Sequence, residues 1–178
     1  MLFRSVPDRG EMVIFDHSWY GRVLEERVED AIPEKSWRQA YLDIIEFERM
    51  LADDGTAILK FFLHISKKEQ EKRFELIESD PLEAWRVTPA DWARHKQYQQ
   101  YLAAYEEMLE LTESEYAPWT IVEAKSKWHA RRKVFEAIIA TLERRLGDKA
   151  PPVEASPEEL SKDAELRAAM ESLTEDAI

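Results

Sequence analysis

The chain has 178 residues, of which 44% are hydrophobic, and it carries a net charge of −12. The acidic excess disfavours non-specific binding to nucleic acid. No apolar run reaches the roughly 18 residues that a membrane-spanning helix needs, and no export signal is visible at the start. The absence of cysteine excludes disulfides and thiolate metal sites. We therefore expect a cytoplasmic protein that neither enters a membrane nor binds nucleic acid.

The charge divides the chain into two parts. Residues 148–178 contain nine acidic and three basic residues, a net charge of −6, and begin with a linker-like Ala-Pro-Pro-Val stretch. We predict that residues 148–178 are an acidic linker and helical tail. Residues 1–147 hold 22 of the 25 basic residues and enough apolar and aromatic residues for a core, so we predict one domain there.

The first half of this domain alternates strand and helix patterns. The short apolar run Met12-Val-Ile-Phe15 is typical of a strand that is buried on both faces of a parallel sheet. A helical pattern follows from Ser18 to about Asp30. A second helix is predicted to open at Ser36 and to close near Gly55, and the apolar residues 57–65 predict a second strand.

The second half continues the alternation. Ser66 is a predicted N-cap of a charged helix, and Thr88, with Pro89 after it, is a predicted N-cap of a long helix to about residue 111. A strand is predicted over 119–123 and a helix over about 128–146, with Gly147 after its end. Three strands alternating with helices indicate an α/β fold with a parallel sheet.

Ligands of parallel sheets bind beyond the carboxyl ends of the strands, and two predicted strands end in polar residues. The first ends at Asp16, and the second ends at His64 to Ser66. A buried strand that ends in aspartate is the Walker-B pattern of phosphate-transferring proteins, in which the carboxylate holds Mg²⁺ directly or through water. The alternative is that Asp16 is a turn or N-cap residue, and His64 a core residue with satisfied hydrogen bonds.

Longer motifs point to one family. The segment Asp16-His-Ser-Trp-Tyr-Gly-Arg22 resembles the Walker-B segment of the family-2 polyphosphate kinases. Residues 59–74 are similar to the strand and lid entry of that family, and residues 80–92 are similar to its lid. The lid sequence is most similar to that of the polyphosphate:AMP phosphotransferase branch. Residues 117–124 are similar to its last strand. The resemblance covers nearly all of residues 3–146.

The resemblance implies a P-loop-kinase-like fold, with a three-layer parallel sheet and a helical lid at about residues 67–112. It also implies Mg²⁺-dependent phosphoryl transfer between polyphosphate and a nucleoside mono- or diphosphate. The implied catalytic residues are Asp16, which would orient the metal, Arg22 and Arg73. The implied phosphate-binding residues are Arg27, Lys67, Lys68 and Arg86. For the lysines, a solvated helix face is an equally good interpretation.

The sequence departs from the family in three places. The 178 residues contain four glycines, and none begins the G-x-x-x-x-G-K loop whose backbone N–H groups cradle phosphates. His17 stands where the family has arginine after the Walker-B aspartate, and Ala84 stands where the closest branch has a basic residue. Each lost cation weakens a phosphate clamp, so we expect impaired activity of the isolated chain.

In the family the glycine-rich loop and its strand lie upstream of the Walker-B strand. We therefore expect a truncated sheet with an exposed apolar edge, and from that edge a homo-oligomer. Three hypotheses stay open. The chain is a fragment or mis-started reading frame of a phosphotransferase, or a non-catalytic relic that pairs with an intact phosphotransferase subunit, or an unrelated α/β binding module.

Overall fold

A computed structural model describes residues 6–147 of the chain. The backbone divides into two compact units, residues 1–138 and 139–178, and the described part of the second unit is residues 139–147. The predicted acidic tail, residues 148–178, lies outside the described residues. The elements in chain order are η2 (Ser18–Arg22), α1 (Glu25–Val28), α2 (Glu34–Asp53), β1 (Lys60–His64), α3 (Lys67–Ser79), η3 (Ala84–Arg86), α4 (Pro89–Lys96), α5 (Tyr98–Thr112), β2 (Trp119–Glu123) and α6 (Lys127–Leu146).

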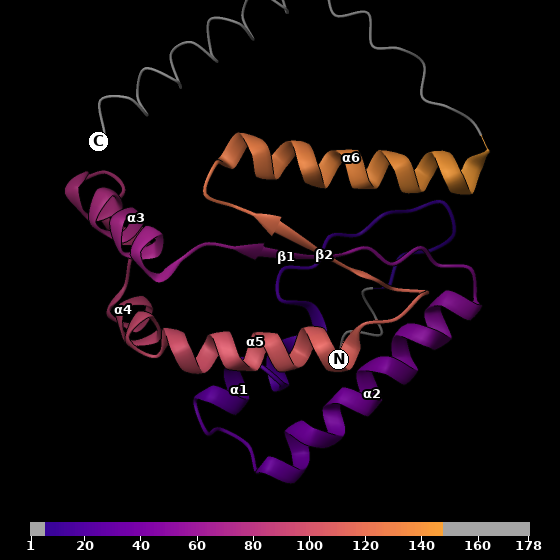
Figure 1. Ribbon diagram of the computed structural model, residues 1–178, viewed down its shortest axis with the longest axis horizontal. Coiled ribbons are helices and arrows are strands. Elements are labelled where there is room, and N and C mark those ends of the chain that lie inside the picture. The colour runs from indigo at the N-terminus through magenta and orange to yellow at the C-terminus, as the bar shows by residue number, and fades with distance from the viewer. Residues whose placement is uncertain (1–5, 148–178) are drawn as a thin grey trace, which may run out of the picture. The chain divides into compact units, whose positions relative to one another are not determined.

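The sheet is the parallel pair β1 and β2, which lie side by side in Figure 1. The register runs from Lys60 opposite Trp119 to His64 opposite Glu123. Because the strands are parallel, their carboxyl ends meet at one edge, where the backbone N–H of Ala124 donates to the carbonyl of His64 at 2.9 Å. The α/β class with parallel strands is therefore confirmed.

The predicted first strand is absent. Residues 12–15 have no strand assignment; residues 12–14 are exposed, with Ile14 at 87% of its possible surface, and Phe15 is half-buried. A strand forms where its backbone N–H and C=O groups pair with a neighbouring strand, and within the described residues 6–147 the sheet contains β1 and β2 without residues 12–15. The apolar pattern of Met12–Phe15 shows a β preference, but a preference alone does not supply the partner strand.

Helix ends with local side-chain caps agree with the predictions. The Ser66 side chain accepts a hydrogen bond from the backbone N–H of Glu69 at the start of α3. Thr88 and Asp91 form a complete capping box at the start of α4, with Pro89 in the first turn. These caps depend on residues three apart in the sequence, which is why the sequence predicts them.

Three helical predictions differ from the structure. The helical pattern from Ser18 to about Asp30 is the 3-10 helix η2 followed by the short helix α1. Helix α2 begins at Glu34, two residues before the predicted Ser36 cap, and Pro33 at its N-cap makes no side-chain cap bond. The predicted long helix after Thr88 is two helices, α4 and α5, separated at Gln97. Proline fixes φ at a value that suits a helix start, so Pro33 sets the boundary of α2.

The two faces of the strand pair contact different helices. On one face a buried cluster joins η2, α2 and α5, with Trp119 of β2 packed against it. On the other face Val122 packs with Ala130 and Val134 from the first part of α6. Side chains alternate between the faces of a strand, so Lys60 and Phe61 point to opposite sides. The largest of the first cluster's side chains come from Tyr20, Val23, Leu24, Tyr41, Ile44 and Met108.

Within residues 6–147, no helix combines the length and the apolar character that crossing a bilayer requires.

Candidate functional site

The turn after Phe15 has an unusual backbone. His17 and Ser18 have positive φ values, 56° and 50°, although both carry a Cβ atom. The backbone N–H of Ser18 donates to the carbonyl of Asp16 at 2.7 Å, and the N–H of Tyr20 donates to the carbonyl of His17 at 3.2 Å. A left-handed conformation costs roughly 1–2 kcal/mol per residue with a side chain. Contacts outside the turn must therefore offset this cost.

The turn presents a carboxylate and an imidazole to solvent. The Asp16 side chain is fully exposed, at 100%. The imidazole of His17 lies 2.5 Å from Glu25 Oε1 through Nδ1, and 3.6 Å from Asp16 Oδ1 through Nε2. His17 therefore bridges the Asp16 turn and the start of α1.

A hollow of about 230 Å³ lies beyond the carboxyl end of β1. Its aromatic wall comes from β1 and α5, and its charged and polar rim comes from the Asp16 turn, α1, α3 and α4. The lining residues are His17, Glu25, Phe62, Leu63, His64, Ile65, Gln70, Arg94, Tyr98, Tyr101, Leu102 and Tyr105. This placement is the one expected for a ligand site of a parallel sheet.

Hydrogen bonds fix the wall and rim of the hollow. The Tyr98 hydroxyl donates to the carbonyl of Ile65 at 2.8 Å, and Arg94 donates to Glu29 at 3.2 Å. Burial raises the pKa of Tyr105 above its ordinary value. Burial also raises the pKa of Tyr101, and the nearby Glu29 carboxylate adds to the shift. Both hydroxyls therefore stay neutral at physiological pH, and the wall is aromatic and uncharged.

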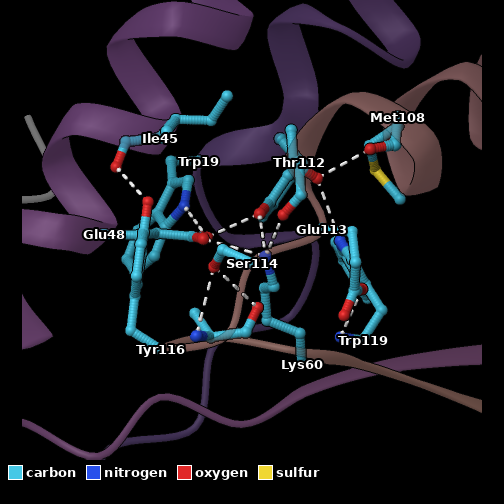
Figure 2. Close-up of polar contacts among 12 residues, drawn as sticks. Trp19, Ile45, Glu48, Lys60, Met108, Thr112, Glu113, Ser114, Tyr116 and Trp119 are labelled. Carbon is cyan, nitrogen blue, oxygen red and sulfur yellow. Dashed lines mark hydrogen bonds and ion pairs between the residues drawn. The ribbon is translucent and has the colours of Figure 1, made fainter.

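A buried polar cluster lies behind the turn, and Figure 2 shows its side chains pointing toward one another. Glu48 Oε1 accepts from Trp19 Nε1 at 3.0 Å and from the Tyr20 hydroxyl at 2.5 Å. Glu48 Oε2 accepts from Lys60 Nζ at 2.8 Å, and Lys60 also donates to the carbonyl of Thr112 at 2.7 Å. Glu48 is only 1% exposed, so these contacts replace its water.

The electrostatics of this cluster follow from its burial. Burial raises the pKa of Tyr20 far above its ordinary value, and the neighbouring Glu48 charge raises it further, so the phenol remains a donor. Burial lowers the pKa of Lys60, and the hydrogen bond and charge of Glu48 act in the opposite direction. Among residues 6–147, every buried side-chain nitrogen and oxygen has a hydrogen-bond partner.

Arg73, a predicted catalytic residue, lies at the carboxyl end of β2. Its guanidinium donates to the carbonyls of Ala124 and Lys125 at 2.7 and 2.8 Å, and to Glu69 at 2.8 Å. The structure therefore places Arg73 at the edge where the strands end, which is the edge that bears the hollow.

The other predicted site residues have varied surroundings. Arg22 is exposed at the end of η2, and Lys67 and Lys68 are exposed in the first turn of α3. Arg86 is exposed and pairs with Glu83. Each of these four side chains is open to solvent.

Arg27 is the predicted phosphate-binding residue with the most protein contacts. It donates to the Tyr41 hydroxyl at 2.9 Å and to Glu107 at 2.6 Å, and its guanidinium lies 4.2 Å from the centre of the Trp37 ring. These contacts tie α1 to α2 and α5. A bound phosphate would have to compete with Glu107 for this guanidinium.

Several polar residues of the site were not predicted, among them Arg94, Glu48 and Lys60. Arg94 lines the hollow, and Glu48 and Lys60 form the buried pair. A signal for the pair existed in the sequence, because Lys60 interrupts an apolar run and Glu48 follows Ile44 by four residues on the apolar face of its helix. Charged residues at core positions indicate a buried pair, but they do not name the partner.

The structure is that of a parallel α/β protein with a polar and aromatic hollow, a candidate ligand site, at the carboxyl end of β1. A family model described as polyphosphate kinase 2 matches residues 2–150. The chain therefore belongs to the polyphosphate kinase 2 family, and the family resemblance of the Asp16–Arg22 motif is confirmed.

Curated relatives show the same similarity. The chain is 42% identical, over 142 residues, to a polyphosphate:AMP phosphotransferase of Pseudomonas syringae pv. tomato, covering 80% of this chain and 28% of the relative. It is also 42% identical, over 140 residues, to an AMP/ADP-polyphosphate phosphotransferase of Meiothermus ruber, covering 79% of this chain and 52% of the relative. The chain thus spans about a quarter to a half of the length of these relatives.

A solved structure supports the fold. The crystal structure of polyphosphate kinase 2 from Arthrobacter aurescens TC1 superposes with a TM-score of 0.76 at 32% sequence identity, covering 92% of this chain and 58% of that chain. This chain is therefore similar in sequence to relatives named as polyphosphate:AMP and AMP/ADP-polyphosphate phosphotransferases, and similar in fold to a polyphosphate kinase 2.

Proposed function

We propose that this chain contributes to Mg²⁺-dependent phosphoryl transfer between inorganic polyphosphate and AMP or ADP. The observation that carries the proposal is the hollow beyond the end of β1, which the Asp16 turn enters through His17 and which lies at the same edge as Arg73. The names of the similar proteins from Pseudomonas syringae pv. tomato and Meiothermus ruber contain this pair of substrates.

The donor set of the site suits magnesium. Mg²⁺ keeps several waters and binds through one or two carboxylates together with substrate phosphates. Asp16 offers one exposed carboxylate, and within residues 6–147 no group of three or more His, Cys, Asp or Glu side chains is arranged as a metal site. Asp16 would hold the ion while phosphate oxygens complete its ligands. Bound there, the ion would neutralise the charge that develops on the transferred group.

The basic residues would bind the polyanion. A loose phosphoryl-transfer transition state mainly requires positioning and charge neutralisation, and guanidinium groups match phosphate oxygens in geometry. Arg73 at the strand ends and the exposed Arg22 would contact the transferred phosphate. The remaining contacts, along the chain of phosphates, would come from Arg27, Lys67, Lys68 and Arg86.

The aromatic wall would bind the nucleotide. Phe62 lies 4.9 Å from Tyr105 between ring centres, and Tyr98 and Tyr101 line the same hollow. Every nucleobase presents a flat π face, and stacking on an aromatic side chain is worth about 1–3 kcal/mol per base. The aromatic wall therefore supports a nucleoside phosphate as the acceptor. Stacking alone does not distinguish adenine from guanine.

We propose further that the isolated 178-residue chain has little or no phosphotransferase activity. Its sequence contains no G-x-x-x-x-G-K loop, and His17 stands where the family has an arginine. The alternative function is a non-catalytic subunit that pairs with an intact phosphotransferase. Exposed apolar side chains, Met12 and Ile14 beside the turn and Leu63 and Ile121 on the strands, favour such an association, either with another copy or with that subunit.

The test combines turnover with binding, using the purified 178-residue chain. We expect no detectable ADP or ATP from polyphosphate and AMP or ADP in the presence of Mg²⁺. We also expect Mg²⁺-dependent polyphosphate binding by calorimetry, which Asp16→Asn weakens by about tenfold or more. Lys35→Met, an exposed change on α2, serves as the control.

Two outcomes would contradict parts of the proposal. Rapid turnover that Asp16→Asn abolishes would refute the impaired activity but support the reaction. A chain that binds neither polyphosphate nor a nucleotide would refute the phosphotransferase site.

A further inference from the structure

The Asp16 turn is held by residues that lie far from it in the sequence. The turn itself contains two left-handed residues with side chains, His17 and Ser18, and few bonds of its own. Trp19 and Tyr20 follow at once, and both donate to the same Glu48 oxygen. Only His17 and Ser18 therefore separate the exposed Asp16 from two residues that are bonded to the buried Glu48. We call Glu48 and Lys60 the anchor.

The anchor is rigid because it is tied to three elements. Glu48 comes from α2, Lys60 from β1, and the carbonyl of Thr112 from the end of α5. Lys60 Nζ lies 3.2 Å from the Tyr20 hydroxyl and 4.9 Å from the centre of the Trp119 ring. Figure 2 shows Trp19, Glu48, Lys60 and Thr112 converging on this point. Moving Tyr20 would break its hydrogen bonds to Glu48 of α2 and to Lys60 of β1.

We propose that Glu48 and Lys60 are positioning residues for the Asp16 carboxylate. The buried pair binds Trp19 and Tyr20, which keeps His17 and Ser18 in the left-handed conformation and so sets the direction in which Asp16 points. An apolar pair of similar size would pack equally well, since buried ion pairs rarely add stability over hydrophobic replacements. The ion pair supplies acceptor and donor groups that an apolar pair lacks. The role of Asp16 in this inference rests on the proposed function.

The test replaces the anchor while keeping its volume. In Glu48→Leu/Lys60→Met no buried charge is left without a partner, although Trp19, Tyr20 and the Thr112 carbonyl each lose a hydrogen bond. The double variant should therefore lose less stability than either single replacement. We expect the amides of Ser18 and Tyr20, which are bonded only within the turn, to exchange their hydrogens about tenfold faster. Amides inside α5 report on global stability and should change much less.

A second variant guards against a failure of the first to fold. Tyr20→Phe removes one hydroxyl and its bond to Glu48, and should accelerate exchange at Ser18 in the same direction but less. Tyr116→Phe is the matched control, because its hydroxyl also binds α2, through the carbonyl of Ile45 at 3.2 Å, without touching Glu48. Two results would overturn the inference. In the first, the exchange rate of the Ser18 amide rises in the variants only as much as the rates of the α5 amides. In the second, it rises as much in Tyr116→Phe as in Tyr20→Phe.

A metal readout separates positioning from simple stability. Mn²⁺ added to the full chain should broaden the NMR signals of Asp16 and its neighbours, and the anchor variant should bind it about tenfold more weakly. Unchanged Mn²⁺ affinity in a variant with a loosened turn would overturn the positioning of the carboxylate. If the wild-type chain binds no Mn²⁺ at Asp16, the metal role in the proposed function fails, and the exchange rates still decide whether Glu48 and Lys60 hold the turn.

Discussion

Two halves of one twelve-residue stretch, Glu11–Arg22, behave in opposite ways. Met12 and Ile14 are apolar, yet they are exposed at 63% and 87%. Trp19 and Tyr20 carry polar groups, yet Tyr20 is buried and both donate to Glu48. The two halves differ in their contacts. Glu48 of α2 and Lys60 of β1 bind Trp19 and Tyr20 in the second half, whereas Met12 and Ile14 in the first half are exposed to solvent. Hydrophobicity alone therefore does not decide which half is buried.

The largest expected effect on stability comes from removing one partner of the buried ion pair between Glu48 and Lys60. Lys60→Met leaves the Glu48 carboxylate buried without its cation, so we expect a loss of about 3–5 kcal/mol in the free energy of unfolding. Urea denaturation followed by tryptophan fluorescence measures this. Lys35→Met on the exposed side of α2 should change stability by less than about 0.5 kcal/mol. A loss below about 1 kcal/mol for Lys60→Met would show that Glu48 finds another partner.

A matched pair of methionines sharpens the comparison. Met108 in the core is 1% exposed, whereas Met12 is 63% exposed. We expect Met108→Ala to lower the free energy of unfolding by about 2–5 kcal/mol, because it removes buried methylene groups and leaves a cavity. Met12→Ala should lower it by less than about 0.5 kcal/mol. Equal effects would mean that Met12 is buried in solution, for example against a second copy of the chain.

The smallest effect concerns an exposed ion pair. The hydrogen bond from Lys133 at 2.8 Å lowers the pKa of Glu123 from 4.5 to about 2. The folded protein therefore binds fewer protons than the unfolded chain between these values. The stabilisation is complete above about pH 4.5 and is lost as the pH falls through about 2. Carbon NMR of the Glu123 carboxyl follows the titration, and Lys133→Met should move its midpoint toward 4.5. A midpoint near 4.5 in the unaltered chain would refute the pairing.

Much of the site was predictable, for a chemical reason. The order of residues from Asp16 to Arg22 carries the family resemblance, and the family is confirmed. The hollow lies at the carboxyl end of β1, where the pattern of a parallel sheet predicts a ligand site. The roles of Asp16, Arg22 and Arg73 stay predictions. Arg94 was not predicted, because a single arginine in a charged helix gives no signal of the cavity beside it.

The sequence by itself determined the family, the α/β class and the helix starts at Ser66 and Thr88. These depend on motifs and on hydrogen bonds between residues three apart, which a sequence displays directly. Only the tertiary structure decided that Met12–Phe15 is not a strand and that Glu48 pairs with Lys60. Strand pairing and buried ion pairs need partners distant along the chain, and the fold alone brings those partners together.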